Sequence, residues 1–133
     1  MYEVYTDGAS TGSTGFGGAG VFIKHDGQVK RHSFPLGKKD THESEFLAVI
    51  KALEILIEEK AEIVSLRSDS QTVVQAIEKK YIHKEQYKPL LKQLLDLSEK
   101  IPLFFVKWIP SKENRADELA RIAIRMNEGL GEK

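Results

Sequence analysis

The spacing of hydrophobic and polar residues changes once along the chain, near Ser44. Before that point, aromatic and β-branched residues alternate roughly with polar ones, which predicts strands at residues 2–6, 18–25 and 28–36. Asp26-Gly27, between the last two, is a strong signal for a two-residue hairpin turn. The glycine-rich stretch 7–20 predicts a loop that tightens into the second strand.

From Ser44 onwards, hydrophobic residues recur at helical spacing. A first helix begins near Ser44, and others are predicted at 71–80, 90–97 and 115–126. Short apolar runs at 63–68 and 103–108 predict two buried strands. Trp108, at the end of the second run, is expected to lie in the core with Phe104 and Phe105. The polar tail 127–133 is expected to fray.

The resulting order of elements is βββαβααβα. A hairpin pair joined to strand–helix–strand units predicts an α/β fold, a five-stranded mixed sheet with helices on both faces. With 133 residues, the chain fits one domain, which we place at residues 1–126. In such sheets, functional sites form at the carboxyl ends of the parallel strands.

Composition excludes several classes of protein. The chain has no cysteine, so it has neither a disulfide scaffold nor a thiolate site. No apolar run approaches the ~20 residues of a membrane helix, and residues 1–3 do not open a secretory signal, so we expect a cytoplasmic protein. Equal numbers of basic and acidic residues, 20 of each, argue against a strongly basic, non-specific nucleic-acid binder.

Carboxylates stand where the predicted sheet would gather them. Asp7 and Asp69 each follow a strand, and Glu45 lies in the first turn of a helix, as does Asp117. Grouped carboxylates repel one another unless they are protonated or neutralised by a cation. Without cysteine, the matching cation is a hard one such as Mg²⁺ or Mn²⁺. Four carboxylates balance two divalent ions, the charge pattern of a two-metal phosphoryl-transfer site.

Each of these acids also has an ordinary structural explanation. An Asp that follows a strand is commonly a turn residue or a helix cap. Asn114 and Asp117 fit a capping box, and Glu45 could simply favour the positive end of its helix. Composition and spacing by themselves leave both explanations open.

Four short motifs occur in a defined order: DGAS at 7–10, EFLA at 45–48, SDSQ at 68–71 and ADELA at 116–120. With the order of elements, they resemble the type 1 ribonuclease H family over residues 1–126. The resemblance implies a ribonuclease H-like fold and metal-dependent hydrolysis of the RNA strand of RNA–DNA hybrids. It places the metal-binding and catalytic acids at Asp7, Glu45, Asp69 and Asp117, and implies two Mg²⁺ ions or Mn²⁺ as cofactors.

The chain departs from many family members at positions that contact the hybrid. Residues 12–15 read GSTG where many members have GNPG, and residues 40–43 read DTHE where many have Thr-Asn-Asn. The family's histidine before the last acid is missing, and Glu113 is a candidate substitute, with a solvated loop acid as the alternative. The basic insertion and a separate hybrid-binding domain are expected to be absent, which makes this a compact form.

Substrate contacts are predicted from the glycine-rich segment, the helix starts and a lysine cluster. Hybrids are recognised by shape and by the 2′-hydroxyl in a wide minor groove. Residues 72–92 hold five lysines against two glutamates, which would suit DNA phosphates or an ordinary solvated face. The predicted substrate-binding residues are Gly8, Ser10, Gly12, Ser13, Thr41, His42, Gln71, Lys79 and Lys80.

The leading hypothesis is a monomeric, metal-dependent endonuclease that acts on RNA–DNA hybrids, with no membrane or protein partner. The altered asparagine positions motivate one alternative, a catalytically weak or inactive hybrid-binding module. A ribonuclease H-fold nuclease with another nucleic-acid substrate is a second alternative, because a fold does not determine a substrate.

Overall fold

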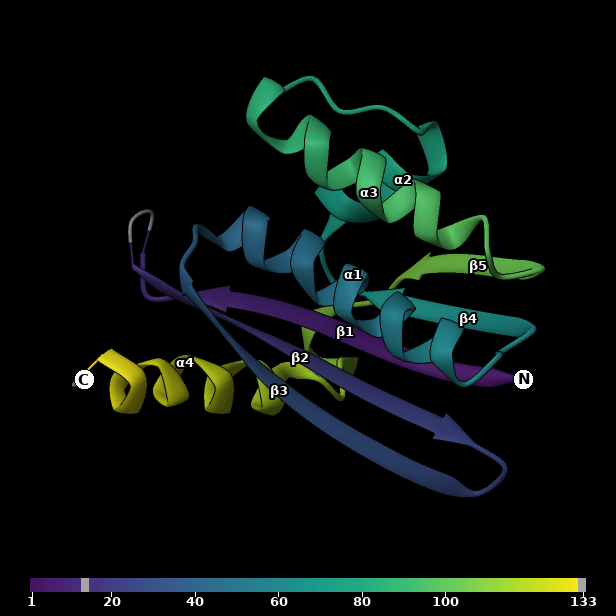
Figure 1. The fold of residues 1–133 in the computed structure, drawn as a ribbon, viewed down its shortest axis with the longest axis horizontal. Coiled ribbons are helices and arrows are strands. Elements are labelled where there is room, and N and C mark those ends of the chain that lie inside the picture. Colours follow the sequence, from purple (N-terminus) through teal and green to yellow (C-terminus); the bar gives the residue numbers. More distant parts are fainter. Residues whose placement is uncertain (13–14, 132–133) are drawn as a thin grey trace.

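The computed structural model describes residues 1–12 and 15–131 and has the predicted order of elements (Figure 1). Within these residues, the strands are β1 (Tyr2–Ser10), β2 (Phe16–His25), β3 (Gln28–Lys38), β4 (Ile63–Ser68) and β5 (Leu103–Trp108). The helices are α1 (Thr41–Glu58), α2 (Gln71–Lys79), α3 (Lys88–Ser98) and α4 (Asp117–Gly131), with short 3₁₀ helices η1 (Glu85–Tyr87) and η2 (Ser111–Glu113). The predicted βββαβααβα order is confirmed.

The sheet is mixed, with strand order β3-β2-β1-β4-β5. The first three strands in sequence are antiparallel, whereas β1, β4 and β5 are parallel. Thr6 pairs with Ser68, which in turn pairs with Trp108. The carboxyl ends of the parallel strands therefore lie side by side at one edge of the sheet.

The hairpin between β2 and β3 turns at the predicted dipeptide. Asp26 has a φ of 51° and Gly27 a φ of 76°, and the flanking residues His25 and Gln28 pair directly. Two consecutive positive φ angles are typical of the type I′ turn that two-residue hairpins prefer. This prediction is confirmed.

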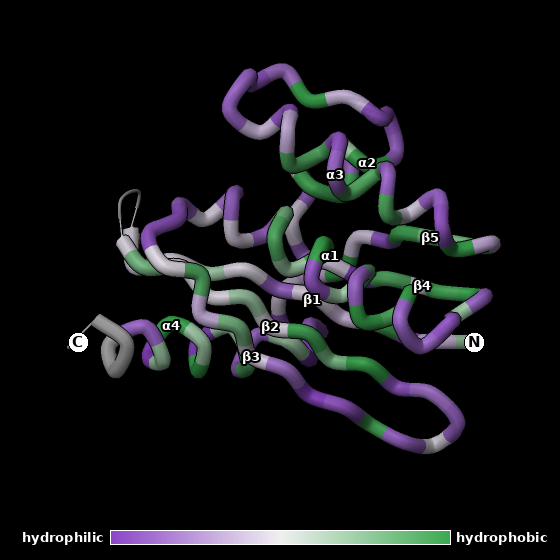
Figure 2. Tube along the Cα trace, in the orientation of Figure 1, coloured by the Kyte–Doolittle hydropathy of each residue, from purple (hydrophilic) through white to green (hydrophobic). Residues whose placement is uncertain are grey.

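Helices cover both faces of the sheet, as predicted. The helices α1, α2 and α3 lie on one face, and α4 lies across β1–β3 on the other (Figure 1). The larger core lies under α1–α3, and its hydrophobic segments include β4 and β5, green in Figure 2. Phe22, Ala116 and Leu119 form a smaller core under α4. Among the described residues, no helix has the length and hydrophobicity that crossing a membrane requires.

The first strand is longer than predicted. It continues through Ser10, so Asp7 lies inside a strand and not after one, and residues 7–10 are not a loop. The glycines that suggested a loop permit close packing instead. A Cβ atom on Gly18 of β2 would lie 2.6 Å from the carbonyl oxygen of Ala120 in α4. Antiparallel pairing with β2 satisfies the backbone of the extended strand.

The first helix begins earlier than predicted, at Thr41 and not near Ser44. Asp40 caps it, because its Oδ1 accepts a hydrogen bond from the Glu43 N–H (2.7 Å). The Glu43 side chain accepts one from the Asp40 N–H in return (2.9 Å), which completes a capping box. Glu45 therefore lies in the second turn of α1.

The last helix differs from the prediction at both ends. It begins at Asp117, two residues late, and continues through Gly131, so residues 127–131 are helical and not frayed. Asn127 is only 3% exposed and connects α4 to the sheet. Its Nδ2 donates to the Gly17 carbonyl (2.8 Å), and its Oδ1 accepts from the Gly37 N–H (2.9 Å).

We expect Asn127→Ala to lower the free energy of unfolding by about 1–3 kcal/mol, because buried backbone groups of β2 and β3 lose their partner. Urea denaturation followed by circular dichroism measures this change. Glu118→Ala, at an exposed position of the same helix, is the control and should change stability by less than about 0.5 kcal/mol. Equal stabilities of the two variants would contradict the anchoring role of Asn127.

Candidate functional site

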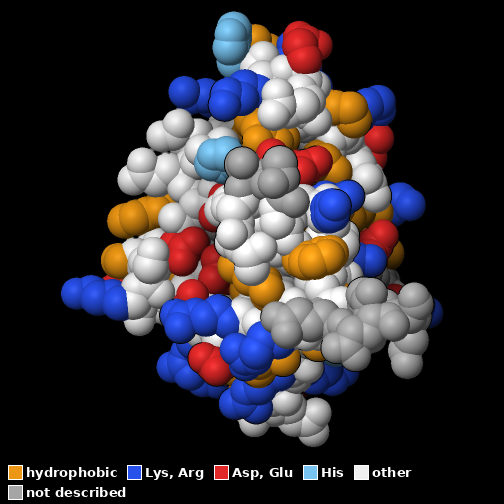
Figure 3. All heavy atoms as spheres, turned by 90° about the vertical axis from the view of Figure 1, so that its left-hand side faces the viewer, with side chains coloured by type: hydrophobic (Ala, Val, Ile, Leu, Met, Phe, Trp, Pro, Cys, Tyr) orange, Lys and Arg blue, Asp and Glu red, His pale blue; other side chains and the backbone are white. Residues whose placement is uncertain are grey.

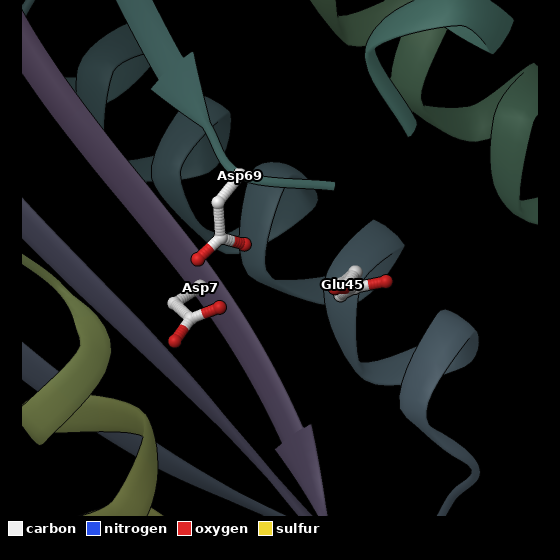
Figure 4. A group of neighbouring side chains, drawn as sticks. All are labelled: Asp7, Glu45 and Asp69. Atoms are coloured by element: carbon white, nitrogen blue, oxygen red, sulfur yellow. The ribbon is translucent and has the colours of Figure 1, made fainter. Parts of the chain in front are cut away.

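Three carboxylates converge at the carboxyl edge of the sheet. Asp7 comes from β1, Asp69 directly follows β4, and Glu45 comes from α1 (Figure 4). One carboxylate oxygen from each of them lies within 4.8 Å of the others. Figure 4 shows the Asp69 side chain extending toward Asp7, with Glu45 to one side of them. These three predicted acids are thus brought together as expected.

Backbone geometry accounts for this convergence. The parallel register pairs Thr6 with Ser68, so the next residues, Asp7 and Asp69, lie at the same level of the sheet. Gly8 then lets α1 approach β1, because a Cβ atom there would lie 2.3 Å from the Glu45 nitrogen. Gly8 is buried, so its clearest role is to bring the strand of Asp7 against the helix of Glu45.

Burial and mutual repulsion disfavour the charged forms of these acids. Asp7 is 8% exposed, and its burial, followed by repulsion from Asp69, Asp117 and Glu45, raises its pKa to about 8. Burial also raises the pKa of Glu45. A hydrogen bond from Ser70 and electrostatic attraction to the nearby His42 oppose this rise. The site therefore favours a species that supplies positive charge.

The ligand atoms suit a hard divalent cation. Asp7, Glu45 and Asp69 offer only carboxylate oxygens, and the chain contains no cysteine that would select a softer metal. Ser70 caps α2, whose positive end faces the same edge as Asp69. This helix end reduces the repulsion but does not remove it, because each helix end supplies only about half a charge.

Asp117, the fourth predicted acid, lies at the border of this group. It begins α4, is close enough to raise the pKa of Asp7, and forms a salt bridge with Arg121. Its side chain is 41% exposed, and it is not one of the three carboxylates that meet within 4.8 Å. Its role as a metal ligand stays a prediction.

The loop that carries Glu113 is tied to β1, the strand that carries Asp7. Glu113 itself is exposed in η2. The neighbouring Asn114 is 6% exposed, and its Nδ2 donates to the Thr6 carbonyl (2.9 Å) while its Oδ1 accepts from the Ala116 N–H (3.0 Å). Asn114 therefore holds the start of α4 against the residue before Asp7.

The predicted substrate contacts are dispersed around this edge. Thr41 and Gln71 are exposed at the first positions of α1 and α2, and Lys79 and Lys80 are exposed at the far end of α2.

The predicted contacts near the end of β1 are partly used within the fold. The Ser10 hydroxyl donates to the Lys39 carbonyl (2.8 Å), which ties the end of β1 to the segment before α1. Gly12 is exposed with a φ of 149°, and Ser13 lies outside the described residues.

The face of the molecule at this edge combines both signs of charge. Figure 3 shows acidic side chains exposed near the middle of the face and a dense group of Lys and Arg below them. Smaller basic groups lie above. The net charge of zero therefore conceals an uneven distribution, with basic side chains around an acidic centre.

Sequence reasoning missed the exposure of Trp108. We expected it in the core, but it is 42% exposed, and Phe105 is 55% exposed, because the edge strand β5 is not covered by α4. Its indole N–H donates to the Asp69 carbonyl (3.1 Å), so Trp108 holds the backbone of a site residue.

Comparison with known proteins identifies the family. The RNase H family model matches residues 1–125. A protein of Enterococcus faecalis named putative hydrolase EbsB is 38% identical, over 94% of this chain and 95% of its own length. A ribonuclease H of Baumannia cicadellinicola is 33% identical, over 91% of this chain and 88% of its own length.

Solved structures show the same fold. The RNase H1 of the archaeon Halobacterium salinarum has a TM-score of 0.87 at 25% identity and covers 94% of this chain and 98% of its own. The LC11-RNase H1 in complex with an RNA/DNA hybrid has a TM-score of 0.88 at 28% identity and covers 96% and 99%. The site and these similarities together show that the chain belongs to the RNase H family of hydrolases.

Proposed function

We propose that this ribonuclease H hydrolyses the RNA strand of RNA–DNA hybrids with two divalent cations, Mg²⁺ or Mn²⁺. The observation that carries the proposal is the meeting of Asp7, Glu45 and Asp69 within 4.8 Å at the carboxyl edge of the sheet. The similarity to LC11-RNase H1, whose structure contains an RNA/DNA hybrid, supports this substrate. A monomeric state and a cytoplasmic location remain part of the proposal, and sedimentation and cell fractionation test them.

In this proposal, the carboxylates of the chain bind and orient, and the protein backbone keeps them in place. Two bound divalent cations would activate a water molecule and would stabilise the oxygen that leaves the phosphorus. Asp7, Glu45 and Asp69 would hold these cations, with Asp117 at the border of the site as the fourth acid. Trp108 and Asn114 keep the backbones beside Asp69 and Asp7 fixed, which limits the reorganisation that the reaction requires.

The substrate would lie across the starts of α1 and α2. Thr41 and Gln71 are exposed there, and both carry side chains that hydrogen-bond to a 2′-hydroxyl or a base edge. Among the lysines of residues 72–92, Lys88 and Lys92 pair with Glu85 and Asp96. Lys79, Lys80 and Lys84 form no salt bridge with any described residue. Of these three, Lys79 and Lys80 are the contacts that the sequence predicts, and we assign phosphate contact to them.

We expect Asp69→Asn to lower hybrid cleavage by at least roughly 100-fold, because a neutral amide holds divalent cations much more weakly than a carboxylate does. The measurement is cleavage of labelled hybrid with Mg²⁺ and with Mn²⁺. Asp96→Asn, on the exposed side of α3, is the matched control and should cleave like the wild type.

The same assay separates the alternatives. Hybrid binding without turnover by the wild-type protein, even with Mn²⁺, would show a binding module. Preferential cleavage of double-stranded RNA, single-stranded RNA or DNA would show another substrate. Normal cleavage by pure Asp69→Asn protein would overturn the proposed site.

We expect the double variant Lys79→Ala/Lys80→Ala to bind hybrid with a salt dependence reduced by about two in the slope of log K against log salt, since each phosphate contact adds roughly one. Fluorescence anisotropy across a salt series measures this slope. Lys24→Ala/Lys60→Ala is the control, because Lys60 has the same left-handed backbone as Lys80. Identical slopes for both double variants would remove Lys79 and Lys80 from the interface.

The pKa of Asp7 predicts a pH-dependent stability in metal-free solution. The folded protein binds this proton more tightly than the unfolded chain, so stability falls as pH rises from about 4 to about 8. We expect Asp7→Asn to remove this loss and to raise stability above that of the wild type at pH 8. Thermal unfolding with and without chelator measures both effects.

Added Mg²⁺ should restore the wild-type stability at pH 8, because a ligand that binds only the folded state stabilises it. It should stabilise Asp7→Asn much less. The same pH dependence of stability in both proteins would show that burial and repulsion of the Asp7 carboxylate do not reduce the stability of the metal-free protein.

A further inference from the structure

Glu45 differs from the other two acids of the site in how it is held. Asp7 and Asp69 extend from or adjoin β-strands that are paired on both sides. Glu45 extends from the surface of a helix, and its side chain has more rotatable bonds. Its position therefore depends on the side chains around it.

His42 is one turn before Glu45 on the same face of α1. Its Nδ1 lies 3.3 Å from the Glu45 Oε1. The same Nδ1 is buried and has no hydrogen-bond partner among the described residues. A buried polar nitrogen without a partner is costly, so a small rotation that turns it to the carboxylate is favourable. The carboxylate of Glu45 is thus the natural acceptor for His42.

Tyr87 holds His42 in this position from outside the helix. It belongs to η1, is 4% exposed, and its ring meets the His42 ring edge-on at 5.8 Å. Its hydroxyl donates to Asp40 Oδ2 (2.9 Å), on the same side chain that caps α1. Tyr87 is therefore held at the start of α1 by its contacts with Asp40 and His42, and His42 in turn contacts Glu45.

We propose that His42, supported by the ring of Tyr87, is a positioning residue that holds the Glu45 carboxylate in the metal site. In this role, His42 acts on a metal-binding carboxylate. Its sequence position had suggested a contact with the substrate instead. The inference rests on the proposed function, since it takes Glu45 to be a metal ligand. Residues that orient metal ligands typically contribute 10–100-fold to metal affinity.

The test is Mn²⁺ binding to the full chain, measured by isothermal titration calorimetry in the absence of nucleic acid. We expect His42→Ala to weaken Mn²⁺ binding by roughly 10-fold. His42→Gln, which keeps a side-chain N–H donor, should recover most of the affinity. His83→Ala, an exposed histidine of the connection between α2 and α3, is the control and should bind Mn²⁺ like the wild type.

Hybrid cleavage at saturating metal separates positioning from substrate contact. If His42 positions Glu45, His42→Ala should have an unchanged KM for hybrid and should need a higher Mn²⁺ concentration for full activity. Unchanged Mn²⁺ affinity together with a raised KM for hybrid would overturn the proposal. If His42→Ala does not fold, His42→Gln and Tyr87→Leu carry the test, and normal Mn²⁺ affinity in both would also overturn it.

Tyr87→Phe distinguishes the ring from the hydroxyl. It keeps the edge-on contact with His42 and loses the hydrogen bond to Asp40, so stability should fall while Mn²⁺ affinity stays near that of the wild type. Reduced Mn²⁺ affinity in Tyr87→Phe would overturn the claim that the ring of Tyr87 is sufficient to support His42. Wild-type protein that binds Mn²⁺ but cleaves no hybrid would overturn the proposed function and leave the positioning result intact.

Discussion

Repulsion between carboxylates is the constraint on which the rest of this structure depends. Asp7, Glu45 and Asp69 meet within 4.8 Å in a place where Asp7 is almost fully buried. Negative charges left to themselves would move apart, so each must be held by elements that are stabilised elsewhere. Paired strands hold two of them, and a capped helix packed through Gly8 holds the third. This repulsion would be relieved by a bound cation, which is why the site suits one.

The apolar parts of the fold supply the stability that this arrangement requires. The large core under α1–α3 and the close contact of α4 with β2 tie together the elements that carry the acids. Asn114 and Asn127 add buried hydrogen bonds from α4 and its preceding loop to the sheet. The polar groups of the site are thus surrounded by contacts that do not depend on metal or substrate.

Local sequence patterns correctly predicted the elements whose structure is determined by their own residues. The runs that form β4 and β5 and the hairpin at Asp26-Gly27 have the predicted bounds. Errors arose where a distant partner decides the structure. The glycines of β1 and β2 lie in strands and not in a loop, and they leave room for the helices packed on the sheet. The tail is helical and not frayed, and Asn127 in it bonds to β2 and β3. Trp108 is exposed because α4 covers only β1–β3.

The sequence by itself determined the family, the order of elements and the identity of the acids, because these depend on residue types and their order along the chain. Only the tertiary structure decided which acids meet and which side chains hold them. Asp117 joins the border of the group and pairs with Arg121, while His42 lies against Glu45. Such contacts depend on distances of a few ångströms between separate elements, and those distances follow from packing and strand register, which no local pattern contains.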